Sequence, residues 1–237
     1  MHSVQAMIRA ALIIAFAALP VPTLAATQTY TITRFDSVRL DAPIRVAITS
    51  GKGVTASGEG DREALDRIDM KVSGNSLVIR MKPRPSGQKG GGGPVTLRLS
   101  TDDVRRATLT GGGSLSIDRM KGTRGDIMLG GGGDLTIGAV ALDQFNILLS
   151  GSGRVTVAGK AGRTDVRVSG PGTLSAEALT ARDARLTNEG TGSIAITASA
   201  TADVRAYGSG DVIVSGKAAC TVVHNGAGRV LCGGDER

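Results

Sequence analysis

The stretch Gly151-Ser152-Gly153-Arg154-Val155-Thr156-Val157 carries the signal that decides the fold: two glycines around one residue, a polar residue, then alternating apolar and polar residues. The signal occurs seven times, and its first glycine stands at Gly111, Gly131, Gly151, Gly170, Gly190, Gly208 and Gly226. The steps are 20, 20, 19, 20, 18 and 18 residues. A nearly constant step predicts a solenoid, in which each coil buries its apolar face only when neighbouring coils stack on it.

Apolar residues recur at fixed positions around this first glycine. Four residues before it stand Ala107, Ile127, Ile147, Val166, Leu186, Val204 and Val222. Four and six residues after it stand Leu115 and Ile117, Leu135 and Ile137, Val155 and Val157, Leu174 and Ala176, Ile194 and Ile196, Val212 and Val214, Val230 and Cys232. The positions between them are mostly polar or small, which is the period-two pattern of strands with one buried face. Each coil is therefore predicted to contain two strands.

The paired glycines lie between the two predicted strands of a coil and are expected to form its corner. Their second members are Gly113, Gly133, Gly153, Gly172, Gly192, Gly210 and Gly228. Glycine adopts backbone angles closed to other residues and allows stacked corners to approach closely. The pattern predicts an all-β, single-domain, mainly parallel β-solenoid with about 20 residues per coil.

The first 25 residues have the features of a secretory signal peptide. Arg9 precedes an apolar run over 10–19 that is too short to cross a bilayer, and small residues follow near a cleavage site at Ala25. We expect the remaining chain, 26–237, to be exported to the periplasm or cell surface, with no integral membrane segment. Without Arg9 it has 27 basic and 21 acidic residues, a net charge of +6.

This positive charge favours anionic partners such as acidic envelope glycans, and proteins are the other partners considered. Nucleic acid is not expected, because single strands stack on aromatic side chains and only 2% of the residues are aromatic, with no Trp. The oligomeric state is left open.

Residues 26–110 are also rich in strand patterns but lack the regular repeat. Strands are expected at 30–34, 38–40, 44–49, 54–56, 70–72, 77–81 and 95–99. A short helical turn is expected over 61–68, capped by Asp61, and the Pro- and Gly-rich stretch 82–94 is expected to be a mobile loop. We interpret this part as opening and cap coils of the same solenoid, with a separate small sandwich as the alternative.

The corner motifs resemble those of the auto-transporter adhesin head GIN domain family. They include Ser150-Gly151-Ser152-Gly153 and Tyr207-Gly208-Ser209-Gly210-Asp211, and they follow Phe35-Asp36-Ser37-Val38 and Gly74-Asn75-Ser76-Leu77-Val78-Ile79. The resemblance covers nearly all of 26–237 and implies a right-handed parallel β-helix-like protein of the cell envelope, without an established biochemical role. Arg154, Thr173, Ser193 and Arg229 depart from the acidic residue of the family's corners.

Two cysteines, Cys220 and Cys232, lie six residues before and after Gly226, both at predicted inward positions. In an exported protein they are expected to form a disulfide that closes the last coil, although two buried thiols are the alternative. His224 is also expected to point inward, as a structural residue and not a metal ligand. Asp134 and Asp211 follow their corner glycines, but the spacing differs from that of calcium-binding solenoids, and no metal or cofactor is expected.

Asp126, Asp165 and Asp203 recur five residues before the corner, on the predicted outward side, with Arg167 and Arg205 two residues further along. Paired carboxylates beside basic residues suit a polysaccharide-cleaving enzyme, but a solvated surface with weak ion pairs is the preferred interpretation. A second outward row, Ser116, Thr136, Thr156 and Ser175, is expected to be a structural hydroxyl ladder. The tripeptide Arg124-Gly125-Asp126 matches a receptor-binding motif, which we attribute to chance.

The sequence thus favours a non-catalytic interaction or structural module, with no catalytic residues assigned. One alternative is a β-helix enzyme that acts on acidic polysaccharide. Another is a periplasmic envelope-stress or chaperone-like protein, which would need an exposed strand edge or apolar patch. Outward apolar residues Ile213, Val223 and Leu231 gather in the late coils and suggest self-association or partner docking there.

Overall fold

The computed structural model describes residues 26–84, 93–233 and 235–236. The predicted signal peptide lies outside these residues, as does 85–92 of the predicted loop. In chain order the elements are β1 (Ala26–Thr29), β2 (Ser37–Asp41), β3 (Arg45–Ser50), β4 (Thr55–Gly60), α1 (Arg62–Asp66), β5 (Ile68–Ser73), β6 (Ser76–Met81), β7 (Val95–Thr101), β8 (Arg106–Leu109), β9 (Ser114–Leu129), β10 (Asp134–Leu149), β11 (Arg154–Val168), β12 (Thr173–Asn188), β13 (Ser193–Ala206), β14 (Val212–Gly216), β15 (Ala219–His224), β16 (Val230–Cys232) and β17 (Asp235–Glu236).

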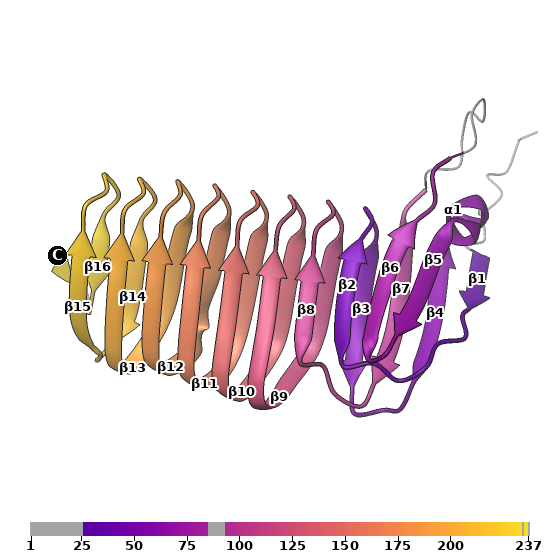
Figure 1. The fold of residues 1–237 in the computed structure, drawn as a ribbon, viewed down its shortest axis with the longest axis horizontal. Helices are drawn as coiled ribbons and strands as arrows, with labels where there is room; N and C mark the ends of the chain where they lie inside the picture. Colours follow the sequence, from indigo (N-terminus) through magenta and orange to yellow (C-terminus); the bar gives the residue numbers. More distant parts are fainter. Residues whose placement is uncertain (1–25, 85–92, 234, 237) are drawn as a thin grey trace, which may run out of the picture.

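These strands build the predicted β-solenoid, seen as a row of stacked coils in Figure 1. Consecutive coils pair in parallel, and Leu135 lies opposite Leu115 on one side and Val155 on the other, 20 residues away in each direction. The long strands β9 to β13 each bend, so that their first halves follow a glycine corner and their second halves precede the next one. We call the edge with the glycine pairs the corner edge and the opposite edge, where these strands bend, the turn edge.

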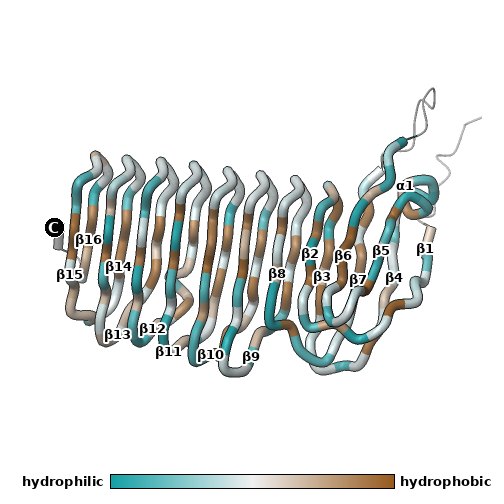
Figure 2. Tube along the Cα trace, viewed as in Figure 1, coloured by the Kyte–Doolittle hydropathy of each residue, from teal (hydrophilic) through white to brown (hydrophobic). Residues whose placement is uncertain are grey.

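Each coil therefore contributes to two walls. The post-corner wall consists of β7, β3, the first halves of β9 to β13, β14 and β16. The pre-corner wall consists of β6, β2, β8, the second halves of β9 to β13 and β15. The core between the walls is built mainly from Val, Leu, Ile and Ala, as predicted, because the narrow interior accepts few rings. Figure 2 shows the resulting alternation of hydrophobic and hydrophilic residues along the strands.

The corner glycines are required by close approach and not by unusual backbone angles. None of the fourteen has a positive φ, so the expected conformational role is wrong for them. A Cβ at Gly153 would collide with the Gly133 carbonyl oxygen, and one at Gly151 with the Gly131 oxygen. In addition, the Gly153 N–H donates to the Gly131 carbonyl at 3.2 Å, and the equivalent bond from Gly172 to Gly151 is 3.0 Å. The corners thus form a hydrogen-bonded stack that excludes side chains.

The opening coil does not stack in chain order. The strands β2 and β3 pair in parallel with β6 and β7 on one side and with β8 and β9 on the other. In Figure 1 this indigo pair accordingly lies between the magenta pairs that follow it in sequence. The chain leaves β3, builds the cap and returns through β6 and β7, and residues 102–105 then carry it to β8. The opening strands β2 and β3 thus pair directly with β8 and β9 in one continuous sheet.

The cap is formed by antiparallel pairs and one helical turn. The strand β1 pairs with β4, β4 with β7, and β5 with β6. The Asp61 side chain caps α1 by accepting from the Ala64 N–H at 2.9 Å, as predicted. The strand expected at 30–34 is wrong, since β1 ends at Thr29 and β2 begins only at Ser37. The Tyr30 N–H still donates to the Ala56 carbonyl at 3.0 Å, and its hydroxyl donates to the Leu65 carbonyl at 3.0 Å.

A polar residue in the core, Asn188, joins two neighbouring corners, Gly190–Gly192 and Gly208–Gly210. Its side-chain amide donates to the carbonyls of Gly192 at 2.8 Å and Gly210 at 3.0 Å, and its oxygen accepts from the Gly190 N–H at 3.2 Å. The side chain is fully buried, and its two bonds to the Gly192 and Gly210 carbonyls are shielded from water. Leu149 and Val168 occupy the same inward position in the preceding coils, so Asn188 is a polar residue at a core position of the repeat.

We expect Gly131→Ala to destabilise the fold by about 1–3 kcal/mol, because the added methyl group meets the Gly111 carbonyl oxygen. The matched control is Gly130→Ala, whose added Cβ would have its nearest neighbour at 3.8 Å. Urea unfolding should place the control within about 0.5 kcal/mol of the unmodified protein. Equal effects of the two substitutions would contradict the corner stack.

We expect Asn188→Ala to cost about 1–3 kcal/mol, since it leaves buried corner groups without a partner. Asn225→Ala, at an exposed position beside the last corner, is the control. The measurement is the midpoint of urea unfolding. A wild-type midpoint for Asn188→Ala would show that Asn188 does not hold the corners together.

Candidate functional site

The predicted charged row lies on the pre-corner wall, where the register brings successive coils together. Asp126 lies opposite Asn146, which lies opposite Asp165, and Arg185 lies between Asp165 and Asp203. The row therefore alternates in charge over its later coils, and its two late carboxylates are separated by an arginine.

Contacts along this row are mainly between opposite charges. Asp126 accepts from the Asn146 amide at 2.6 Å and from Arg124 at 3.2 Å, and Arg106 approaches it at 3.7 Å. Arg185 lies 4.0 Å from Asp165 and 3.6 Å from Asp203. Each carboxylate thus has an arginine partner from its own or a neighbouring coil. Such pairs brace adjacent coils, although solvent-exposed pairs contribute at most about 1 kcal/mol each.

The receptor-like tripeptide lies inside β9 and not on a loop. The Arg124 and Asp126 side chains pair with each other, while Gly125 points inward, where an added Cβ would collide with Leu142. The tripeptide is therefore explained by the packing of β9: its charged residues form an ion pair and its glycine occupies a tight inward position.

The post-corner wall carries the predicted hydroxyl ladder. Ser116, Thr136, Thr156 and Ser175 lie opposite one another in successive coils. The row continues through Ala195, Ile213 and Leu231. This wall thus has an uncharged central stripe, unlike the ion-paired row of the pre-corner wall.

The late apolar residues do not form one patch. Ile213 lies opposite Leu231 on the post-corner wall, whereas Val223 lies opposite Arg205 on the pre-corner wall. Ile213 and Val223 are 38% and 41% exposed. The three residues do lie in the late coils, as expected, but on two different walls, because the Gly226 corner reverses the chain between Val223 and Leu231.

The last coil is closed by the predicted disulfide between Cys220 and Cys232, whose Cα atoms are 6.5 Å apart. Cys232 is buried and Cys220 is half-buried. His224, expected to point inward, is instead exposed, because no further coil pairs with the outer edge of β15 in the described residues. The described residues also contain no group of three or more His, Cys, Asp or Glu side chains that could hold a metal ion.

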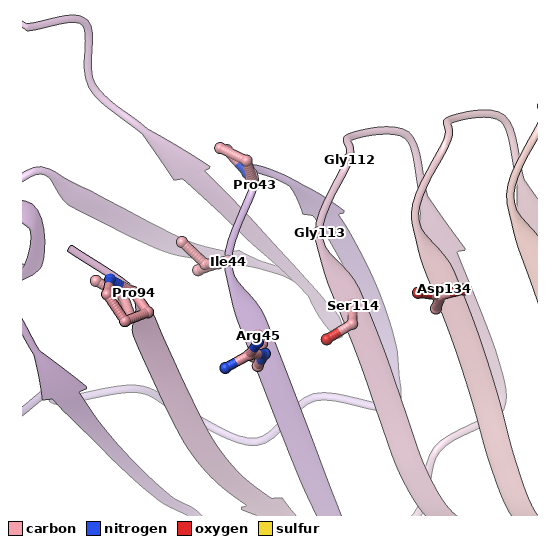
Figure 3. A pocket seen from close by; sticks show the side chains of 9 residues that line it. Pro43, Ile44, Arg45, Pro94, Gly112, Gly113, Ser114 and Asp134 are labelled. Atoms are coloured by element: carbon pink, nitrogen blue, oxygen red, sulfur yellow. The ribbon is translucent and has the colours of Figure 1, made fainter. Parts of the chain in front are cut away.

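Two cavities lie where the opening coils meet the regular repeats. The first, of about 300 Å³, is near the corner edge and is lined by Pro43, Ile44, Arg45, Pro94, Val95, Gly112, Gly113, Ser114 and Asp134. Figure 3 shows Arg45, Ser114 and Asp134 on three neighbouring strands of the post-corner wall. The second, of about 420 Å³, is at the turn edge and is lined by Asp103, Arg105, Lys121, Gly122, Thr123 and Arg124. We call this second one the turn-edge cavity.

Sequence reasoning missed both cavities. Lys121 lies in the regular coil of β9, but Arg45 and Arg105 come from the part of the chain without the regular step, and the displaced stacking of β2 and β3 brings them beside β9. The one available signal was that regular spacing begins at Gly111 and not earlier.

Two ion pairs lower the pKa of their carboxyl groups. Hydrogen bonds from Arg229, one of them at 2.8 Å, lower the pKa of Asp211 from its ordinary 3.8. The Arg98 side chain likewise lowers the pKa of Glu59 from 4.5, through a hydrogen bond and charge attraction. These pairs join adjacent strands of the post-corner wall and its cap.

We expect Asp211→Asn to make the protein less sensitive to acid. Because the pKa of Asp211 is lowered by folding, its contribution is complete above 3.8 and is lost as the pH falls below that value. The difference in urea midpoint between wild type and variant should therefore shrink from neutral pH to below pH 3.8. Asp134→Asn, at the equivalent corner position, is the control, and an identical pH trend for both variants would contradict this assignment.

Comparison with known proteins identifies the family. The family model described as "Putative auto-transporter adhesin, head GIN domain" matches residues 34–218. A search of curated proteins found no match. In the described part of the chain, no helix is long and apolar enough to cross a membrane.

Solved structures share the fold at low sequence identity. A "putative adhesin" from Bacteroides fragilis is 18% identical, with a TM-score of 0.78, over 88% of this chain and 96% of the other. A "putative lipid binding protein" from Parabacteroides distasonis is 20% identical, with a TM-score of 0.69 over the same shares. A "putative adhesin" from Parabacteroides merdae is 15% identical, with a TM-score of 0.59, over 88% and 96%. These likenesses show the fold alone, whereas the family match spans most of the sequence, so the chain belongs to the auto-transporter adhesin head GIN domain family.

Proposed function

We propose that the protein is an exported, non-catalytic module of the cell envelope that binds anionic polymers through the opening and cap coils. The observation that carries this proposal is the uneven charge. Residues 26–110 contain 14 Lys and Arg against 9 Asp and Glu, whereas residues 111–237 contain 13 against 12. Nearly all of the positive surplus therefore lies in the opening and cap part of the solenoid.

Exposed cations of this part are available for a partner. Arg39 on β2, Arg80 on β6 and Lys82 just beyond it have no side-chain ion pair within 4.0 Å among the described residues. Arg39 lies opposite Val78 on β6, so these cations occupy neighbouring strands of one wall. A local basic surface raises the concentration of an anionic polymer beside it, and this attraction weakens with salt.

The non-catalytic part of the proposal is supported by the ion-paired row. Catalysis on a glycosidic bond requires a carboxylic acid and a second carboxylate facing one substrate bond. Here Asp165 and Asp203 are separated by Arg185, which lies near both. Export is supported by the disulfide and by the character of residues 1–25, since disulfides persist in oxidising compartments.

The test is retention of the protein, purified after expression of the full chain, on immobilised acidic polysaccharide and on lipopolysaccharide across a salt series. We expect retention at low salt, intact polysaccharide chains and release as salt rises. Arg39→Gln/Arg80→Gln/Lys82→Gln should weaken binding at least tenfold, about 1.4 kcal/mol or more.

The matched control is Arg154→Gln/Lys160→Gln/Lys217→Gln, which removes the same charge from exposed positions of the regular coils. It should change binding less than about threefold, since it leaves the opening and cap part intact. Equal losses would show that the attraction is not localised there. Shortened polysaccharide would instead establish an enzyme, and absence of retention at low salt would exclude anionic polymers as partners.

A further inference from the structure

We propose that the turn-edge cavity binds a phosphate monoester, such as the phosphoryl group of a sugar or lipid. This inference rests on the proposed function in that it assigns a chemical group and a place to the anionic partner. The cavity volume of about 420 Å³ is within the range of roughly 300–1,000 Å³ typical of small-molecule sites, so it accommodates a phosphoryl group with part of its carrier.

The cavity exists because coil stacking is interrupted at this point. In the regular coils the turns stack, with Lys121 opposite Ala141 and Ala141 opposite Lys160. On its other side the turn of β9 faces residues 102–105, which arrive from β7, and strand pairing resumes only at Arg106 opposite Asp126. Gly122 leaves this space open, since a Cβ built on it has no neighbour within 4 Å.

The charge of the cavity is strongly unbalanced. Arg105, Lys121 and Arg124 line it against one carboxylate, Asp103, whose oxygen lies 3.9 Å from the Lys121 ammonium nitrogen. All three cationic residues are exposed, and Arg105 has no side-chain partner among the described residues.

The residues next to the cavity do not cancel its positive charge. Arg124 and Arg106 share Asp126, at 3.2 and 3.7 Å. The cavity residues Arg105, Lys121 and Arg124 and the neighbouring Arg106 carry four positive charges. The two carboxylates beside them, Asp103 and Asp126, leave an excess of about two positive charges.

This excess selects the ligand class. A phosphate monoester carries about −1.5 to −2 charges at neutral pH, whereas a sugar carboxylate carries only one. Guanidinium groups also bind phosphoryl oxygens with two parallel hydrogen bonds, and an ammonium group adds a point charge.

Other cavities lack this feature. The corner-edge cavity sets Arg45 against Asp134, and a cavity further along the pre-corner wall sets Arg163 and Arg185 against Asp183 and Asp203. Both are balanced in charge, and a further cavity sets Arg167 and Arg185 against Asp165, a surplus of one cation, so the turn-edge cavity has the largest positive surplus of these four.

The regular coils offer a closely matched control. Lys160 and Arg163 occupy, two coils further on, the same register positions as Lys121 and Arg124. Lys121→Gln/Arg124→Gln and Lys160→Gln/Arg163→Gln therefore remove the same residue types from equivalent turns, but only the first pair lines the turn-edge cavity. Arg105→Gln is a second test variant that leaves the Asp126 ion pairs intact.

The experiment is isothermal titration of the purified full-chain product with inorganic phosphate, glucose 6-phosphate and glucuronate. Flotation with phosphatidylcholine vesicles, with or without phosphatidic acid, accompanies it. We expect glucose 6-phosphate to bind with a Kd of about 1 mM or tighter, and glucuronate at least fivefold more weakly. Lys121→Gln/Arg124→Gln and Arg105→Gln should each weaken binding at least tenfold with unchanged thermal midpoints, and the control pair less than twofold.

Binding of glucose 6-phosphate without vesicle capture would assign the phosphate to a sugar carrier, and capture only with phosphatidic acid would assign it to a lipid. The inference would be overturned if no phosphate probe bound, if glucuronate bound equally well, or if the control pair lost as much affinity as the test pair. Retention on polysaccharide without phosphate binding would overturn this inference alone. Phosphate binding without polymer retention would leave it standing and refute the proposed function.

Discussion

Contact between stacked glycine corners is the constraint on which the rest of the structure depends. The first and second glycines of each pair lie directly against the backbone oxygens of the preceding corner, leaving no room for a Cβ. Hydrogen bonds such as that from the Gly192 N–H to the Gly170 carbonyl, at 3.0 Å, connect the same corners. Because both walls begin or end at these corners, their spacing sets the register of every strand pair along the regular repeats.

Once the corners are stacked, the surface becomes a set of rows. Each outward position repeats in the next coil, so the Asp126–Asp203 row becomes an ion-paired brace and the Ser116–Ser175 row an uncharged stripe. Hollows also occur along the regular rows, but their cations face carboxylates of neighbouring coils. Where regular stacking is interrupted, between the opening coils and β9, the cavity contains a surplus of cations, Arg105 among them.

The sequence predicted the regular coils in detail, because alternation and step length together determine which side chains point inward. Val155 and Val157 are buried for that reason, and Cys220 and Cys232 are joined as expected. The position of β2 and β3 between later strands could not be predicted, since it depends on long-range pairing without local periodicity. The cavity residues Arg45 and Arg105 were missed for the same reason, and Lys121 was missed because the neighbours that face it across the cavity, Asp103 and Arg105, lie outside the repeat.

Errors also arose at the ends of the solenoid, where neighbours on one side are missing. His224 follows the inward pattern but is exposed, because the outer edge of the β15 strand has no described partner. Tyr30 has strand propensity and its N–H still donates to the Ala56 carbonyl of β4 at 3.0 Å, but the strand does not continue beyond it, and its hydroxyl donates to the Leu65 carbonyl of the helical turn. The repeat pattern correctly predicts the burial of residues that have a coil on both sides. At the end of the solenoid, where one neighbouring coil is missing among the described residues, an inward position such as that of His224 can be exposed.

Native-state hydrogen exchange of the corner amides tests the central claim most directly. The N–H groups of Gly153, Gly172 and Gly192 lie outside regular strands but donate to the preceding corner at 3.2, 3.0 and 3.0 Å. If the corner stack holds the coils together, these amides should be protected to within about tenfold of the strand amides around them. Exchange at the rate of unstructured loops, with strand amides still protected, would contradict the account.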